Sequence, residues 1–266
     1  MIRLNLGRNC LRYIIRLYGI KEIYVPFYIC KSVYHAINKE GCKIKIYHIN
    51  ENFLPTISFP DESYILYVNY FGMCDDNCRK MVSQYPNVII DNTQAFYSEV
   101  KGVAGFNSLR KFFNVQNGAF LYTDEVLNQT FEEDSLSLNH KTIQQDYEQF
   151  LRNELILDNE DIKLISPKVN ADLKKIDFGR DKENRLNNFW RLKNLFKDYN
   201  FISLTPKEKE IPFCYPLSTK EIPIIEKLKS TKIPFLSLWG EIPSDMPEHK
   251  FLNNTVALPL DTYLPL

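Results

Sequence analysis

The sequence predicts an α/β fold in which a mostly parallel sheet is covered by helices, followed by a smaller C-terminal α+β lobe. Two observations lead to this prediction. Through the first 124 residues, short apolar segments alternate with amphipathic ones, a rhythm typical of parallel strands joined by helices. Beyond Asp124 the chain becomes polar and then rich in proline. We therefore expect a large domain over residues 1–165, and a long helix with a small domain over residues 166–266.

The elements of the first half follow one another in a regular order. The pattern predicts an amphipathic helix from Gly7 to about Gly19, a strand over residues 22–25, and a helix over residues 30–40. Residues 43–48 alternate like a strand, residues 64–68 are almost all apolar, and residues 75–85 predict a polar helix. Two more apolar strands are expected at residues 88–90, just before Asp91, and at residues 119–122.

The second half predicts one long charged helix over residues 169–199. Basic residues alternate there with acidic ones, which is typical of a solvated helix face. The basic residues are Lys174, Lys175, Arg180, Lys182 and Arg185. The alternative is that Arg180 or Arg185 meets the phosphates of a nucleotide. Trp239 is expected to pack the small lobe against the large one.

Composition excludes several classes of function. Thirty-three basic and thirty-three acidic residues leave no net charge, which argues against a nucleic-acid or anionic-membrane partner. Four arginines interrupt the first twenty residues, so the N-terminus is neither a signal peptide nor a membrane span. The six cysteines lack the spacing of a disulfide framework or a zinc site, so we expect no metal. The sequence predicts a cytoplasmic protein.

Two stretches are predicted to lie where ligands bind in open α/β sheets, at the carboxyl ends of strands and the starts of helices. Gly7-Arg8-Asn9 opens the first helix, where free backbone N–H groups can seat a phosphate. A glycine that only caps or turns the chain is the alternative. Asp91 follows an apolar strand and could keep a ligand's ring nitrogen protonated by a charge-assisted hydrogen bond. An N-cap or turn aspartate is the alternative there.

Two further stretches add an amine and an aromatic surface. In Ser108-Leu-Arg-Lys111, a lysine beside apolar residues and another cation can have a lowered pKa and attack a carbonyl to form a Schiff base. Ser108 could hydrogen-bond an anion on the same ligand; an ordinary loop lysine is the alternative. Pro26-Phe-Tyr-Ile-Cys30 follows a strand and could stack on a planar ring or pack in the core. Together the four stretches meet the requirements of one cofactor, pyridoxal phosphate.

The sequence resembles the DegT/DnrJ/EryC1/StrS family of sugar aminotransferases, which are fold-type-I pyridoxal phosphate-dependent enzymes. The matching segments are Gly7–Leu11, Val25–Val33, Tyr70–Gly72, Val88–Ala95, Ser108–Lys111, Gly118–Asp124 and Ala257–Leu260. The resemblance implies the fold-type-I architecture and transfer of an amino group, usually from glutamate, to a nucleotide-linked keto-sugar. Such chemistry serves the synthesis of surface polysaccharides or glycoconjugates. The resemblance also implies a homodimer with the site at the subunit interface.

The resemblance implies a role for each matched residue. Lys111 would form the Schiff base with pyridoxal phosphate and then move protons between cofactor and substrate. Asp91 would pair with the pyridinium nitrogen, and Gln94 would lie near the phenolic oxygen. The phosphate would be held by backbone N–H groups of the first helix and by a serine hydroxyl. The remaining cofactor-binding residues would be Gly7, Arg8, Asn9, Tyr28, Cys30 and Ser108.

Two departures from the family pattern keep alternatives open. Members usually have a segment before the Gly7 motif, and they usually have an aromatic residue where this chain has Cys30, so ring stacking would pass to Tyr28 or weaken. One alternative is a shortened homologue without catalysis that acts as a binding or partner subunit. The other is a pyridoxal phosphate enzyme of different carbonyl–amine chemistry, such as dehydration. Relatives that act as dehydrases carry a histidine in place of the lysine, so Lys111 counts against that branch.

Overall fold

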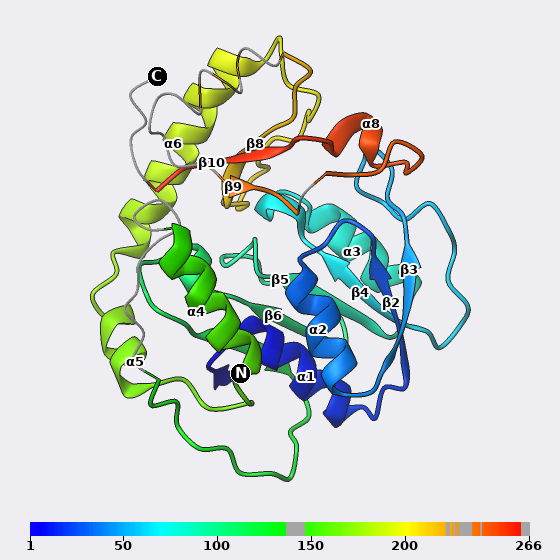
Figure 1. Ribbon diagram of the computed structural model, residues 1–266, viewed down its shortest axis with the longest axis vertical. Coiled ribbons are helices and arrows are strands. Elements are labelled where there is room, and N and C mark those ends of the chain that lie inside the picture. The colour runs from blue at the N-terminus through cyan, green and yellow to red at the C-terminus, as the bar shows by residue number, and fades with distance from the viewer. Residues whose placement is uncertain are drawn as a thin grey trace.

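The computed structural model describes residues 1–136, 147–221, 224, 226, 228, 236–239 and 241–261. Its centre is a seven-stranded sheet with the order β1-β7-β6-β5-β4-β2-β3 (Figure 1). Neighbouring strands from β3 to β6 run parallel, whereas β7 is antiparallel to β6 and β1 is antiparallel to β7. The strands are β1 (Ile2–Leu4), β2 (Glu22–Pro26), β3 (Lys43–Tyr47), β4 (Tyr64–Val68), β5 (Val88–Asn92), β6 (Ala104–Asn107) and β7 (Ala119–Thr123). The predicted α/β class with a mostly parallel sheet is confirmed.

The central strands are apolar because both faces of the sheet are covered. All five residues of β5 are buried, and Val88, Ile89 and Ile90 have no exposed surface. The register pairs Val68 with Asp91, and Asp91 with Phe106, so the carboxyl ends of β4, β5 and β6 meet at one edge. Residues that directly follow these strands therefore lie close together, at the carboxyl edge of the sheet.

Helices cover the sheet as the periodicity predicted. They are α1 (Gly7–Leu17), α2 (Lys31–Lys39) and α3 (Asp75–Gln84), and short 3₁₀ turns occur at η1 (Tyr70–Gly72) and η2 (Leu109–Lys111). The apolar face of α1 is fully buried through Cys10, Leu11 and Ile14. Strands β1 and β6 were not predicted. The first has only three residues, and the second contains a glycine and an asparagine, which are poor strand formers.

The long helix predicted over residues 169–199 is wrong, because the structure has two helices there. They are α5 (Pro167–Leu173) and α6 (Phe178–Phe196), preceded along the chain by α4 (Tyr147–Asn159). The break lies before Asp177, whose Oδ1 accepts a hydrogen bond from the Arg180 backbone N–H at 3.0 Å and so caps the start of α6. In Figure 1, α6 runs along one side of the molecule, from α5 to the C-terminal strands.

The predicted solvated face of this segment is also wrong for one residue. Arg185 is 1% exposed, and its guanidinium donates to Asp181 Oδ2, the Phe213 carbonyl and the Phe112 carbonyl. Arg185 therefore does not lie on a solvated face. Its guanidinium links α6 to Phe112, in the turn that follows Lys111, and to Phe213, just before the small sheet. The alternating charges of this segment do not distinguish Arg185 from its exposed neighbours. It is buried because its side of the helix packs against the rest of the molecule.

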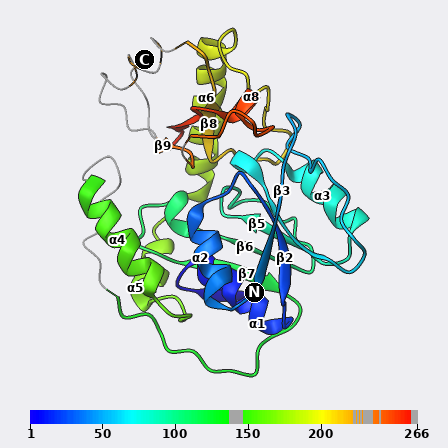
Figure 2. The same ribbon diagram turned by 45° about the vertical axis from the view of Figure 1, so that its right-hand side comes forward.

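The C-terminal part contains a small antiparallel sheet with β10 in the middle (Figure 1). In Figure 2 this sheet lies beside α6. Its strands are β8 (Cys214–Leu217), β9 (Leu236–Ser237) and β10 (Val256–Pro259), with the short helix α8 (His249–Leu252) before β10. Trp239 touches Tyr28 and Tyr70 of the large sheet region, as expected for a residue packing one lobe on the other. The domain boundary at residue 165 stays a prediction. Among the described residues, none of the helices has the length and apolar character needed to span a membrane.

Candidate active site

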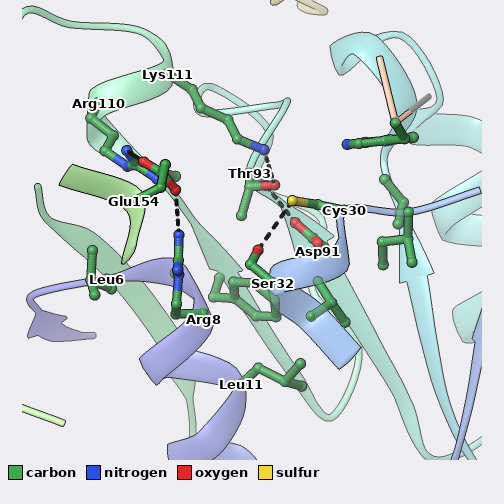
Figure 3. Close-up of a pocket in the computed structure, with 17 residues that line it drawn as sticks. Leu6, Arg8, Leu11, Cys30, Ser32, Asp91, Thr93, Arg110, Lys111 and Glu154 are labelled. Carbon is green, nitrogen blue, oxygen red and sulfur yellow. Dashed lines mark hydrogen bonds and ion pairs between the residues drawn. The ribbon is translucent and has the colours of Figure 1, made fainter. Parts of the chain in front are cut away.

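A pocket lies where the carboxyl ends of β4 to β6 meet the start of α1. Six of the nine residues singled out from the sequence line it: Gly7, Arg8, Cys30, Asp91, Ser108 and Lys111. Residues that are 104 positions apart in the chain thus share one cavity, and Figure 3 shows how they face one another.

Lys111 ends η2 and extends into this pocket toward Thr93 (Figure 3). Its Nζ donates a hydrogen bond to Thr93 Oγ1 at 2.9 Å. Burial lowers the pKa of the Lys111 amine, and the charge on Asp91 opposes that shift. A buried amine with a lowered pKa is neutral in a larger fraction of molecules, and the neutral form is the nucleophile. Lys111 is therefore a pocket amine and not an ordinary loop lysine.

Asp91 lies within β5 and is 3% exposed. Its Oδ1 accepts a hydrogen bond from the Thr93 backbone N–H at 2.8 Å. Burial raises the pKa of the Asp91 carboxyl, while the Lys111 charge and the Thr93 hydrogen bond act in the opposite direction. Thr93 therefore contacts both groups, with its backbone on the acid and its hydroxyl on the amine. Thr93 was not predicted as a site residue, although it lies two residues after Asp91 in the matched segment.

Gly7 brings the start of α1 close to the end of the sheet. A Cβ at this position would lie 3.1 Å from the Asn107 carbonyl oxygen and 3.2 Å from Thr93 Cγ2, which is tighter than ordinary contact. The residue before it, Leu6, makes no side-chain cap, and its carbonyl accepts hydrogen bonds from the Asn9 and Cys10 N–H groups. Ser108 lines the same pocket and is 6% exposed.

Three predicted residues lie outside the lining of this pocket. Asn9 is buried, and its Nδ2 donates to the Asp161 carbonyl at 2.8 Å. Gln94 is also buried, and its Oε1 accepts from the Phe71 backbone N–H at 2.7 Å. Tyr28 packs edge-on against Trp239 with ring centroids 4.4 Å apart. Their expected contacts with a cofactor stay predictions, and each has a structural task in this arrangement.

Cys30 lines the pocket and accepts a hydrogen bond at Sγ from Ser32 Oγ at 3.1 Å. An aromatic surface reaches the pocket instead from Trp239, which the sequence analysis had placed only between the lobes. Trp239 belongs to no motif that would mark it as a pocket residue. It comes from the C-terminal part of the chain, far in the sequence from the strand ends that form the pocket.

Arg8, Arg110 and Glu154 form an ion cluster on one wall of the pocket (Figure 3). Glu154 Oε2 accepts from Arg8 Nη2 at 2.8 Å and from Arg110 Nη2 at 3.0 Å, while Oε1 pairs with Arg110 Nη1. Burial would raise the pKa of the Glu154 carboxyl, but Arg110 and Arg8 lower it to about 2. Arg8 also pairs with Asp158 of α4.

The two arginines respond differently to this environment. Burial and the charge on Arg110 lower the pKa of Arg8. Burial also acts against the charged form of Arg110, but the attraction and hydrogen bond of Glu154 prevail and raise its pKa. Arg110 could have been singled out from the sequence, because it precedes Lys111 directly. Glu154 could not, because it is 43 residues further along the chain than Lys111, in a helix with no motif.

No protein-family model matches the chain, and no curated protein matches its sequence. Solved structures do match its fold. A DegT DnrJ EryC1 StrS aminotransferase from Brucella abortus is 14% identical, with a TM-score of 0.65 over 97% of this chain and 80% of that one. The sugar aminotransferase CalS13 from Micromonospora echinospora is 12% identical, with a TM-score of 0.63 over 99% of this chain and 83% of that one.

A third similar structure is the E. coli GDP-4-keto-6-deoxy-D-mannose-3-dehydratase with bound hydrated PLP. It is 14% identical, with a TM-score of 0.66 over 99% of this chain and 84% of that one. These likenesses extend over nearly the whole chain, and at such identities they establish the fold. The chain has the architecture of the DegT-type sugar aminotransferases and of this related dehydratase, as the resemblance predicted.

Proposed function

We propose that this chain is a pyridoxal phosphate-dependent aminotransferase that moves an amino group, from glutamate, to a nucleotide-linked keto-sugar. The observation that carries the proposal is the convergence of Lys111 and Asp91 on Thr93 inside one pocket. Enzymes of this fold include sugar aminotransferases, which supports the substrate class. The proposal extends to synthesis of polysaccharide precursors.

The residues present fit this cofactor. Asp91 is a buried carboxylic group at the carboxyl end of β5, Lys111 is a half-buried amine whose pKa is lowered by burial, and the space beside Gly7 is too tight for an unstrained Cβ. When bound, pyridoxal phosphate supplies an aldehyde that condenses with amines and a ring that withdraws electrons from the condensed carbon. The N–H groups at the start of α1 suit the phosphate.

Each residue then has a task that its surroundings suit. Asp91, which the Thr93 backbone N–H fixes in place, would hold a proton on the ring nitrogen by a charge-assisted hydrogen bond. Lys111 would be the amine that binds the cofactor, and its Nζ would act as the general base that moves a proton. Thr93 Oγ1 orients that Nζ by accepting its hydrogen bond. Trp239 and the apolar lining exclude water from one side.

We also propose that the chain works in the cytoplasm as a homodimer with the site at the subunit interface. Six free cysteines, five of them buried, support a reducing compartment. The pocket opens to solvent, which leaves room for a second subunit to complete its wall.

Borohydride reduction after incubation with pyridoxal phosphate tests the proposal, followed by peptide mass spectrometry. A pyridoxyl group confined to Lys111 is expected, and Lys111→Arg should remove it while the folded signal in circular dichroism is retained. Lys101→Ala is the matched control, since Lys101 is a partly exposed lysine paired with Asp124. Modification scattered over surface lysines would refute the proposal and favour the non-catalytic alternative.

Dehydration is the second candidate, and similarity to the E. coli dehydratase favours it. The two chemistries differ in the product. With ¹⁵N-labelled glutamate, an aminotransferase leaves the label on the sugar, whereas a dehydratase yields a sugar that has lost water and gained no nitrogen. Because Lys111 stands where dehydrases of the resembled family have histidine, we expect labelled amino sugar.

A further inference from the structure

One carboxylate and two guanidinium groups fill the wall of the pocket beside the start of α1. Glu154 lies in the middle of α4, while Arg8 belongs to α1 and Arg110 to η2. Their side chains are 24%, 9% and 20% exposed respectively. Three of the four terminal guanidinium nitrogens are directed at Glu154, and the fourth pairs with Asp158.

The guanidinium groups of Arg8 and Arg110 face one carboxylate, an arrangement that suits an oxyanion. Guanidinium groups match the geometry of carboxylate and phosphate, and two of them facing one anion give a strong, directional seat. The anion in the structure is the chain's own carboxylate, which stays charged at neutral pH because the arginines lower its pKa to about 2. Another oxyanion that approaches these terminal nitrogens of Arg8 and Arg110 competes with Glu154 for their N–H groups.

Glu154 also attaches its helix to the rest of the molecule. Five polar contacts join α4 to α1, α2 and η2: Arg8 with Glu154, Arg8 with Asp158, Arg110 with Glu154, His35 with Asp158, and Lys39 Nζ with the Asp158 carbonyl. Leu151, Leu155 and Ile156 of this helix are 43%, 66% and 43% exposed, whereas Leu157 is buried. The contacts at the two arginines therefore attach α4 together with the buried side chain of Leu157.

We propose that Arg8 and Arg110 form an oxyanion seat and that Glu154 is its internal competitor, so that a phosphate group binding there releases Glu154 and loosens α4. The phosphate group has more oxygens and up to one more negative charge than the carboxylate, which favours the exchange. The identity of the natural phosphate rests on the proposed function, whereas the competition itself does not. Two sources carry this chemistry, the cofactor and a nucleoside diphosphate.

Calorimetric titration with inorganic phosphate measures the competition directly. Glu154→Gln should bind phosphate about tenfold more tightly than the wild type, the equivalent of one hydrogen bond to a charged group. Glu148→Gln is the matched control, because it removes the same charge from the same helix at a residue 84% exposed, and it should change nothing. Arg110→Gln should weaken binding. Equal or weaker binding by Glu154→Gln would overturn the proposal and make Glu154 a residue that positions the arginines.

Hydrogen exchange on the wild-type chain provides a second test that does not depend on any variant folding. Phosphate should accelerate exchange of the amides in residues 147–159, and unchanged or slower exchange would overturn the proposal. The source is then resolved with Glu154→Gln. Tighter pyridoxal phosphate with unchanged pyridoxal assigns the seat to the cofactor, and tighter uridine diphosphate assigns it to the nucleotide. If Lys111 takes up no pyridoxyl group, the proposed function fails, while the phosphate titration still decides on the seat.

Discussion

Replacing Arg185 with methionine should destabilise the protein more than any other single change of charge on α6. The guanidinium donates to Asp181 Oδ2 at 2.9 Å, to the Phe213 carbonyl at 3.0 Å and to the Phe112 carbonyl at 2.9 Å. It also lies 4.6 Å from the centroid of the Phe112 ring. Methionine fills part of the space but donates no hydrogen bond, so two carbonyls and a carboxylate lose a partner.

The magnitude follows from which groups are left behind. Removing one partner of a buried ion pair costs about 3–5 kcal/mol, because the remaining charge stays without compensation. Asp181 keeps one hydrogen bond, from the Tyr97 hydroxyl at 2.7 Å, so we expect about 4 kcal/mol in the free energy of unfolding. For a chain of this size that corresponds to a fall in Tm of about 10 °C.

Urea unfolding followed by circular dichroism measures this loss, with Arg180→Met as the matched control. Arg180 is on the same helix and exposed, so its replacement should change the free energy of unfolding by less than about 0.5 kcal/mol. Adding Asp181→Asn to Arg185→Met should recover part of the loss, since the unpaired carboxylate is then gone. If the two arginine variants unfold at the same urea concentration, the buried network does not stabilise the fold.

Three further predictions concern the pocket and its supports. Asp91→Asn should lower the pH midpoint for labelling of Lys111 by an amine-specific reagent, because burial then lowers the pKa of the amine without the opposing carboxylate; an upward shift would contradict the assignment. Glu154 has its pKa lowered from 4.5 to about 2, so it contributes stability above pH 4.5 that is lost as pH falls to 2. Glu154→Gln should remove about 3 kcal/mol of that pH dependence, as measured by denaturant unfolding at pH 2, 3, 4 and 6. Gly118→Ala should cost about 3 kcal/mol, because φ is +104° and the new Cβ would lie 2.6 Å from a leucine side chain; Gly19→Ala, with φ +59° and open space, should cost about 1 kcal/mol in the same assay.

Residues that follow strands were the ones that the sequence could place. The apolar run before Asp91 had to be a buried strand of a parallel sheet, and carboxyl ends of parallel strands share an edge. Lys111 was predictable for a related reason, since its apolar neighbours indicated a chain turning into the core. Both predictions used information within about ten residues of the site residue, where hydrophobic pattern and backbone direction are closely linked.

Residues placed by packing between distant elements could not be predicted in the same way. Glu154 reaches the pocket because the side chains of α4 pair with Arg8 at the start of α1, and nothing near Glu154 in the sequence indicates that contact. Arg185 resembles its charged neighbours in composition, and only the position of α6 against β8 decides that it is the buried one. In both cases the deciding interaction joins residues of different elements, 28 positions apart for Arg185 with Phe213 and 44 for Arg110 with Glu154, so it is a property of the tertiary fold.

The charges in the pocket explain why amine chemistry and anion binding can coexist there. Three cations line it, Lys111, Arg8 and Arg110. Asp91 acts on the amine through its charge, without a direct ion pair, whereas Glu154 pairs directly with both arginines. The Lys111 side of the pocket and the arginine side differ in which group of the chain a ligand must displace. At Lys111, burial already lowers the pKa, so the amine can lose its proton and react without a new counter-ion. At the arginines the positive charge is permanent, and a ligand gains by supplying an anion that replaces Glu154. A ligand that combines a carbonyl with a phosphate therefore satisfies both sides at once, whereas a carbonyl or a phosphate alone satisfies one.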